Sequence, residues 1–168
     1  MTSRLNRIKA IIFDLDDTLY DCSGALISNI TEIKNISLFP DVINSINKLR
    51  QSGFKLILVT AGDKDMQERK IKVLGLERQF DETIIINNSS GKEGYFKDIL
   101  NKYNLIPEQV ICVGDKIKDE IAAGKSLGMI TALIKHGRHY NFYKSNTNEI
   151  VPDLYLSNVP DLLKHLAC

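Results

Sequence analysis

Short apolar runs alternate with segments of helical periodicity along most of this chain. The runs predict buried strands and lie at 8–14, 55–60, 83–86, 110–114 and 130–134. The helical segments lie near 40–52, 64–75, 93–104 and 118–127. Such alternation is typical of βαβ units, so the pattern predicts an α/β fold: a three-layer, Rossmann-like domain with a central parallel sheet.

Two more elements are expected near the carboxyl end of the sequence, a short edge strand at 153–157 and a closing helix at 160–166. Gly53, Asn104 and Gly128 stand where residues that end helices are common. A chain of 168 residues can bury one hydrophobic core but is short for two. We therefore predict a single domain over 1–168.

The composition is that of an ordinary soluble protein, with 43% hydrophobic and 26% charged residues. The 22 Lys and Arg residues nearly balance the 21 Asp and Glu residues, so charge gives no reason to expect nucleic acid or an anionic membrane as a partner. The first apolar stretch stops at Asp14, too soon for a signal-peptide core or a membrane span. Three scattered cysteines form no disulfide framework or zinc motif, which favours a reducing, cytoplasmic setting.

The first apolar run ends abruptly in carboxylates, at Asp14 and Asp16. In open α/β sheets, ligands bind at the carboxyl ends of the strands. Residues two apart on an extended segment point the same way, so these two like charges need a cation to hold them together. The run therefore predicts a charged site at one end of the sheet.

The segment from Ile11 to Leu19 resembles motif I of the haloacid dehalogenase (HAD) superfamily, apolar residues followed by Asp-x-Asp-x-Thr. Three later strings resemble the remaining motifs in the expected order: a strand that ends in Thr60, Lys92 within Ser-Gly-Lys-Glu, and the strand 110–114 followed by Asp115. Four motifs in order, each at a strand end or a helix start, are hard to assemble by chance. The resemblance spans almost the whole chain.

This resemblance implies that Asp14 attacks a phosphoryl phosphorus and forms an aspartyl phosphate, and that Asp16 exchanges protons with the leaving group and with water. A carboxylate that approaches a phosphate dianion is repelled, so a hard divalent cation is required. The resemblance implies Mg²⁺, held by Asp14, the backbone carbonyl of Asp16 and Asp115. Either Asp119 or Glu120 is the second acid of the last motif, and we choose Asp119 as the further metal ligand.

Phosphate binding is expected from the end of the second strand and from a lysine. By resemblance, the hydroxyl of Thr60 and the N–H groups of Ala61 and Gly62 would hold the phosphoryl oxygens. Lys92 would bind the phosphate and the nucleophile as a compact positive charge, with Lys97 as a rival one turn later.

Other polar residues near these motifs are weaker candidates. Asp17 is expected to have a structural role, because its side chain should face away from its neighbours. Lys116 and Lys118 would either extend the phosphate-binding surface or be solvated. The segment 136–148 is expected to be a loop on the rim of the site, where Arg138 or His139 could contact the substrate.

The short insert at 21–39 is too short for a full helical cap domain, so the resemblance is to a small HAD member with minimal or no cap. We expect a Mg²⁺-dependent phosphomonoester hydrolase whose substrate is a phosphorylated small molecule or a macromolecule. An open site is a reason to suspect a homo-oligomer. The alternatives are a phosphotransferase of the same fold and a non-catalytic phosphate-binding or scaffolding protein. Asp16 disfavours dehalogenation, because a halide leaves without a proton.

Overall fold

The structure is a computed structural model that describes residues 2–25, 33–87, 91–144 and 150–166. Its centre is a six-stranded sheet in the order β3-β2-β1-β4-β5-β6, in which every pair of neighbours is parallel. The strands are β1 (Ala10–Phe13), β2 (Lys55–Ala61), β3 (Glu82–Ile86), β4 (Val110–Gly114), β5 (Ile130–Ile134) and β6 (Leu154–Leu156). The three-layer, Rossmann-like α/β fold expected from the alternating pattern is confirmed.

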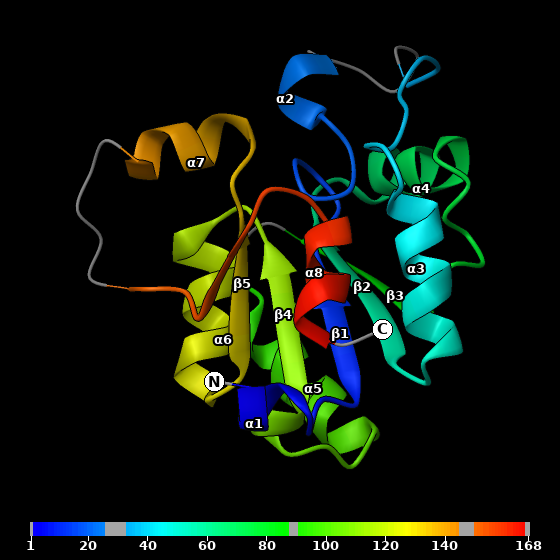
Figure 1. Cartoon of the computed structure of the whole chain (residues 1–168). Helices are drawn as coiled ribbons and strands as arrows, with labels where there is room; N and C mark the ends of the chain where they lie inside the picture. The colour runs from blue at the N-terminus through cyan, green and yellow to red at the C-terminus, as the bar shows by residue number, and fades with distance from the viewer. Residues whose placement is uncertain (1, 26–32, 88–90, 145–149, 167–168) are drawn as a thin grey trace.

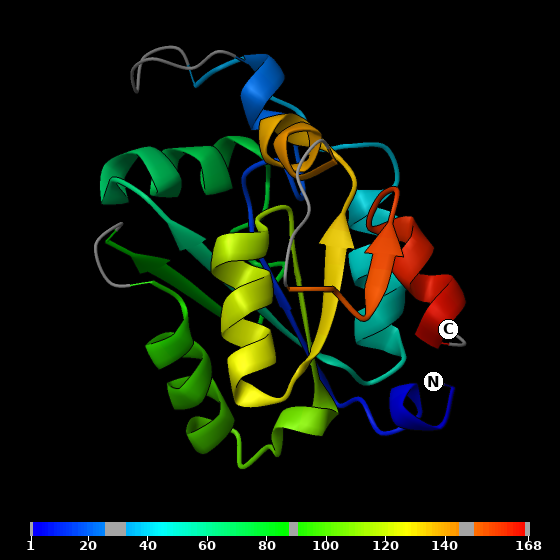
Figure 2. The same ribbon diagram turned by 90° about the vertical axis from the view of Figure 1, so that its left-hand side faces the viewer.

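Helices cover both faces of this sheet (Figures 1 and 2). On one face lie α3 (Val42–Gln51) and α8 (Pro160–Leu166), with the short α1 (Thr2–Leu5) against α8. On the other face lie α5 (Glu93–Lys102) and α6 (Ala122–Leu127), and a π turn at Ile117–Ile121 precedes α6. The remaining long helix, α4 (Lys64–Val73), packs through Ile71 against the same core as α3.

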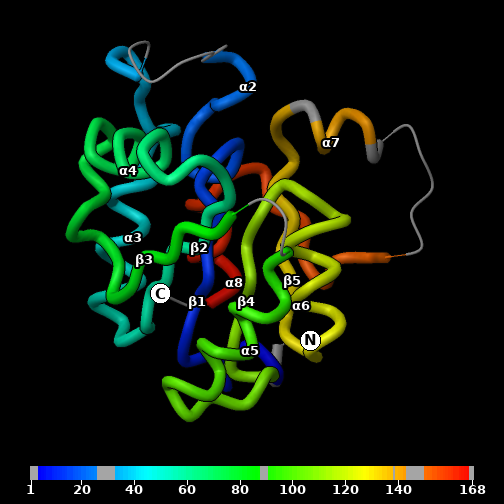
Figure 3. Tube along the Cα trace, turned by 180° about the vertical axis from the view of Figure 1, so that it is seen from behind, coloured from blue at the N-terminus to red at the C-terminus, as the bar shows by residue number. Residues whose placement is uncertain are grey.

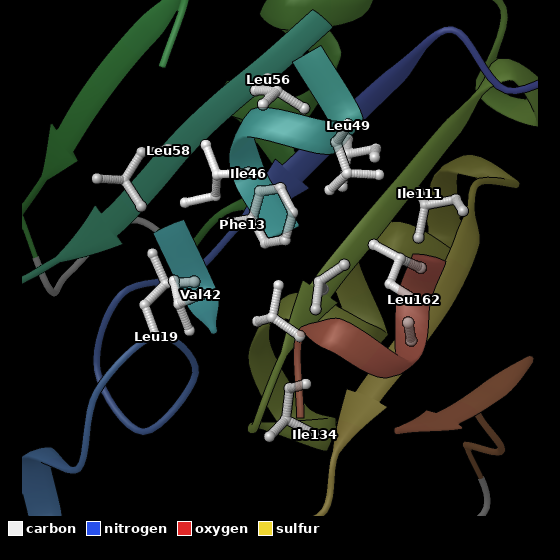
Figure 4. Packing of buried hydrophobic residues seen from close by; sticks show 14 of the residues in the cluster. Phe13, Leu19, Val42, Ile46, Leu49, Leu56, Leu58, Ile111, Ile134 and Leu162 are labelled. Atoms are coloured by element: carbon white, nitrogen blue, oxygen red, sulfur yellow. The ribbon is translucent and has the colours of Figure 1, made fainter. Parts of the chain in front are cut away.

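Successive residues of the central strands alternate between two apolar cores. Ile11 and Phe13 of β1 face the core under α3 and α8, whereas Ile12 faces the core under α5 and α6. Figure 4 shows the ring of Phe13 among aliphatic side chains that include Ile46 and Leu58. Both faces of the strand are therefore buried, which explains why its sequence is continuously apolar rather than alternating.

Two short helices lie beyond the carboxyl ends of the strands, at the end of the molecule away from α1 (Figures 1 and 3). They are α2 (Cys22–Ala25) and α7 (Gly137–Lys144), and they contact each other. The rim segment expected as a loop is thus largely helical, which corrects the prediction for 136–148, although 145–149 lie outside the described residues. Helix α7 begins at Gly137, whose φ is +75° and where a Cβ would lie 2.7 Å from Cγ of Asp17.

The insert at 21–39 is described only in part. Its visible portions are α2 and a stretch in which Leu38 forms an isolated antiparallel bridge with Tyr20. The assignment of 1–168 to one domain stays a prediction. Within the ranges that the structure covers, no helix has both the length and the apolar composition that crossing a bilayer requires.

Candidate active site

The strand order places the ends of β1 and β4 side by side. The chain runs from β1 outward through β2 to β3, and then crosses to β4 on the other side of β1. Such a reversal opens a crevice at the carboxyl ends of the two strands. Asp14 follows β1 and Asp115 follows β4, and the N–H of Asp14 donates to the carbonyl of Val113 at 2.9 Å. The two carboxylates expected as metal ligands are therefore neighbours.

Both carboxylates are buried, with Asp14 3% and Asp115 0% exposed. Among the described residues, neither Oδ2 of Asp14 nor either oxygen of Asp115 has a hydrogen-bond partner. Burial raises the pKa of Asp115 to about 9, and the charges of Asp14 and Glu120 add to this rise. Burial also raises the pKa of Asp14 to about 6, although Lys92 offsets part of the effect.

Buried acidic oxygens without donors are costly, and a hard divalent cation would satisfy them. The residues present therefore fit Mg²⁺, which prefers oxygen ligands of this kind.

Lys92 supplies the positive charge of the site. Its Nζ lies 2.5 Å from Oδ1 of Asp14 and also contacts Oε1 of Glu120. The side chain is 1% exposed, and the residue immediately precedes α5. Burial alone would lower the pKa of Lys92, but the carboxylates of Asp14 and Glu120 outweigh it and raise the pKa above its ordinary value. The rival Lys97 is exposed on α5, so it is Lys92 that the fold brings to Asp14.

The π turn decides which of two adjacent acids points into the site. Glu120 is 1% exposed and its Oε2 accepts from the N–H of Lys116 at 3.1 Å. The side chain of Asp119 is 26% exposed, and its Oδ2 lies 4.0 Å from Nζ of Lys92. Gly114 makes room for the inward acid, since a Cβ there would lie 2.6 Å from Cγ of Glu120. The geometry therefore favours Glu120, the alternative we did not choose, as the second acid of the motif.

The flanking lysines of this turn differ. Lys116 is half-buried, and Lys118 is exposed. Burial would lower the pKa of Lys116, but the nearby carboxylates of Asp14 and Glu120 raise it above its ordinary value.

Asp16 lies beside this cluster but is held by a different set of partners. Its Oδ1 accepts from Tyr20 Oη at 2.7 Å and from Lys70 Nζ at 2.8 Å. Its Oδ2 accepts from Gln67 Nε2 at 3.0 Å. Burial alone would raise the pKa of Asp16, but the ammonium of Lys70 and the two neutral donors outweigh burial and lower it. The carboxylate of Asp16 is therefore stabilised as an anion.

Thr60 lies near the end of β2 and is 1% exposed. Gln67 Nε2 lies 2.5 Å from the hydroxyl oxygen of Thr60 and 3.2 Å from the carbonyl of Ala61. An amide nitrogen carries only two hydrogens, so the acceptor oxygens of Asp16, Thr60 and Ala61 share two N–H donors, and the hydroxyl hydrogen of Thr60 does not point at this nitrogen. The N–H of Gly62, in contrast, already donates to the carbonyl of Ile86 at 3.0 Å, so it is not free for a phosphoryl oxygen.

The rim above these residues holds a second group of polar side chains. One ligand atom each from Asp17, Asp21 and His136 lie within 4.8 Å of one another, so these three could hold a metal ion. Asp17 also accepts from the backbone and the hydroxyl of Ser23, which fits the structural role expected for it. The expected role of Arg138 stays a prediction, because its side chain lies outside the described part of the structure.

Sequence reasoning missed Tyr20, Gln67 and Lys70 as neighbours of Asp16. The pattern that could have revealed two of them is the spacing of three between Gln67 and Lys70, which places both on one face of a helix. Nothing in the sequence shows which face of so charged a helix is turned inward.

Comparison with known proteins identifies the family of this chain. The family model for haloacid dehalogenase-like hydrolases matches residues 26–134, more than half of the chain. The chain belongs to the haloacid dehalogenase-like hydrolases. The segment of this hydrolase that the family model matches contains Thr60, Lys92 and Asp115, whereas Asp14 and Asp16 precede it.

Curated relatives of this haloacid dehalogenase-like hydrolase include two named phosphatases. It is 30% identical to glyceraldehyde 3-phosphate phosphatase of Methanopyrus kandleri over 137 residues, and this alignment covers 79% of the chain and 58% of the relative. It is 29% identical to phosphoglycolate phosphatase of Aquifex aeolicus over 129 residues, and this alignment covers 75% of the chain and 57% of the relative. The chain thus spans a little under three fifths of the length of these two relatives.

Solved structures show the same fold. HAD-hydrolase YfnB from Bacillus subtilis superposes with a TM-score of 0.76 at 16% identity, covering 96% of this chain and 100% of that one. At this identity the likeness concerns the fold alone.

Proposed function

We propose that this chain is a Mg²⁺-dependent phosphomonoester hydrolase that acts through an aspartyl phosphate on Asp14. The main support for the proposal is the environment of the Asp14 carboxylate. Its Oδ1 is bound by Lys92, while its Oδ2 is buried and accepts from no described residue. A carboxylate held at one oxygen and free at the other is arranged for attack by the free oxygen. The relatives named as phosphatases support the same reaction class.

In the first half-reaction, Oδ2 of Asp14 forms a bond to phosphorus. The ester P–O bond breaks, its electron pair goes to the leaving oxygen, and that oxygen takes a proton from Asp16. The ammonium of Lys92 and the hydroxyl of Thr60 stabilise the phosphoryl oxygens, whose charge builds up during this transfer.

In the second half-reaction, water attacks the phosphorus of the aspartyl phosphate. Asp16 accepts the proton of the water, and the bond between phosphorus and Asp14 breaks. The products are inorganic phosphate and the original carboxylate of Asp14, with the proton of Asp16 restored. The anionic form of Asp16 that its three donors stabilise suits this step.

Mg²⁺ would be held by Asp14, Asp115 and the backbone carbonyl of Asp16, and it would neutralise negative charge between the nucleophile and the phosphoryl group. The unsatisfied oxygens of Asp115 are the structural support for this assignment. YfnB, which shares the fold, was crystallised with bound magnesium. We assign Glu120 to hold Lys92, whereas a metal-binding role for Asp119 stays a prediction.

The substrate class that we propose is a small phosphorylated metabolite, because the named relatives act on glyceraldehyde 3-phosphate and phosphoglycolate. We expect the residues that choose among such esters to lie on the rim, in α2 and α7.

The experiment is release of para-nitrophenol from its phosphate ester, with Mg²⁺ and then with a chelator. We expect turnover by the wild-type protein with Mg²⁺ only, and none by Asp14→Asn. Asp65→Asn, an exposed position on α4, is the matched control and should retain activity. Activity that survives Asp14→Asn would refute the assigned nucleophile. A wild-type protein that releases no product from this ester or from the two metabolites above would refute the proposed hydrolase.

A second measurement addresses the metal without relying on turnover. Mg²⁺ should raise the melting temperature of the wild-type protein, because binding to the folded state alone stabilises it. Asp115→Asn should abolish this shift. An equal shift in both proteins would place the cation elsewhere, for example at Asp17, Asp21 and His136.

A further inference from the structure

Two buried polar residues of α4 are turned toward the active site. Gln67 is 1% and Lys70 6% exposed, whereas most other polar side chains of this helix face solvent. Burying an amide and an ammonium costs free energy unless each finds partners. Both find a shared one in Asp16, 51 and 54 residues earlier in the chain.

The hydrogen bonds of Asp16 leave one position of its carboxylate open. Each carboxylate oxygen has two lone pairs that can accept. Oδ1 accepts from Tyr20 and Lys70, so both of its positions are taken. Among the hydrogen bonds that the described residues make, Oδ2 accepts one, from Gln67, so one position remains there. A proton bound at that position would leave all three hydrogen bonds intact.

The orientation of the Gln67 amide is fixed by its partners. Its nitrogen faces the carboxylate of Asp16 and the carbonyl of Ala61, and a carbonyl can only accept. Placing the amide oxygen there instead would set acceptor against acceptor. The amide therefore donates to Oδ2 of Asp16 and holds the plane of the carboxylate.

We propose that Gln67 and Lys70 are positioning residues, which hold Asp16 so that it carries its exchangeable proton at the single open position of Oδ2. The inference rests on the proposed function and goes beyond it, because it assigns to α4 the control of proton delivery to the leaving group. When the ester P–O bond breaks, its electron pair goes to the leaving oxygen and the proton at Oδ2 goes to the same atom. Without the two donors, the carboxyl group can rotate and the proton is delivered less often.

The leaving group distinguishes positioning from a merely structural role. Para-nitrophenolate departs readily without a proton, whereas an alkoxide requires one. The ratio kcat/KM covers the steps up to departure of the leaving group, so the later hydrolysis of the aspartyl phosphate does not enter it. We would therefore compare kcat/KM for para-nitrophenyl phosphate with kcat/KM for glycerol 2-phosphate.

Lys70→Met removes the ammonium but keeps the length of the side chain. We expect it to lower kcat/KM for glycerol 2-phosphate by roughly 10²-fold, the usual scale of acid catalysis. We expect kcat/KM for para-nitrophenyl phosphate to change little. Gln67→Leu should act in the same direction, and Lys70→Arg should recover much of the loss. Lys72→Met, an exposed position on the same helix, is the matched control and should leave both ratios unchanged.

A double variant tests whether Lys70 acts through Asp16. In an Asp16→Asn background, Lys70→Met should cause little further loss with glycerol 2-phosphate, because the group it positions no longer delivers a proton. Equal losses with both esters, or a full additional loss in the Asp16→Asn background, would overturn the inference while leaving the hydrolase assignment intact. A wild-type protein inactive on both esters would instead overturn the proposed function and this inference with it. If Lys70→Met lacks a cooperative thermal transition, Gln67→Leu decides by the same comparison.

Discussion

The ammonium of Lys92 lies 2.5 Å from Oδ1 of Asp14, and both side chains are almost completely buried. The same ammonium contacts Glu120, which is buried to the same degree. One cation therefore stands between two buried anions. Removing one member of such a group leaves the others buried without compensation, which costs more than the pairing itself contributes.

Lys92→Met should therefore abolish phosphatase activity and also destabilise the protein, by about 3 kcal/mol. The physical reason for the destabilisation is the burial of Asp14 and Glu120 without their shared cation. Urea unfolding at neutral pH measures it. Lys97→Met, on the exposed side of α5, should unfold at the same urea concentration as the wild-type protein. Equal unfolding midpoints for Lys92→Met and the wild-type protein would contradict the buried triad.

Glu120→Gln should reduce kcat/KM far more than Asp119→Asn does. Glu120 contacts Lys92 directly, whereas Asp119 is partly exposed and 4.0 Å away from the same ammonium. Steady-state kinetics of the two variants, measured side by side with para-nitrophenyl phosphate, decide between the acids. A larger loss in Asp119→Asn would instead favour Asp119, the residue first chosen as the second acid of the motif.

Two Gly→Ala substitutions should change the free energy of unfolding in opposite directions. Gly114→Ala places a Cβ 2.6 Å from Cγ of Glu120, so it should displace this acid, destabilise the fold by about 1–3 kcal/mol and lower activity. Gly94→Ala, in the first turn of α5, meets no atom within 4 Å and should stabilise the fold by about 0.5 kcal/mol. Thermal unfolding of the two variants checks both signs, and destabilisation by each would show that the clash is not the cause.

Asp153 should make the stability of the fold depend on acid pH. Burial would raise its pKa, but Lys125 at 2.8 Å and Thr131 at 2.9 Å outweigh burial and lower it below the ordinary 3.8. The stabilisation is fully present above the unfolded pKa and is lost as the pH falls through the lower folded value. Asp153→Asn should thus be less stable than the wild-type protein at pH 7, and the difference should shrink toward pH 3. A difference that is constant with pH would exclude this ionisation as its cause.

The strands and long helices could be predicted from the sequence because their signals are local. The sequence itself shows the apolar runs and the residues that commonly end helices. Asn104 is an example, and its φ of +50° in the structure agrees with that role. Helix α7 was not predicted, because its segment Gly-Arg-His-Tyr-Asn-Phe has no apolar stripe and begins with a helix breaker. It forms where Gly137 can approach Asp17, a contact between distant parts of the chain.

The site was predictable to the extent that it lies at strand ends. Asp14, Thr60 and Asp115 follow or end three neighbouring strands, so topology alone brings them together. Gln67 and Lys70 were not predicted, because they stand in a helix rich in charged residues and only the packing of that helix shows which of them are buried.

The π turn at Ile117–Ile121 holds one residue more per turn than an α-helix would. Within this turn the side chain of Glu120 is buried against Lys92, whereas that of its neighbour Asp119 is 26% exposed, so a shift by one residue would exchange the acid that faces the lysine. An alignment of such chains is therefore best anchored on both flanking elements, with the gap between them allowed to float.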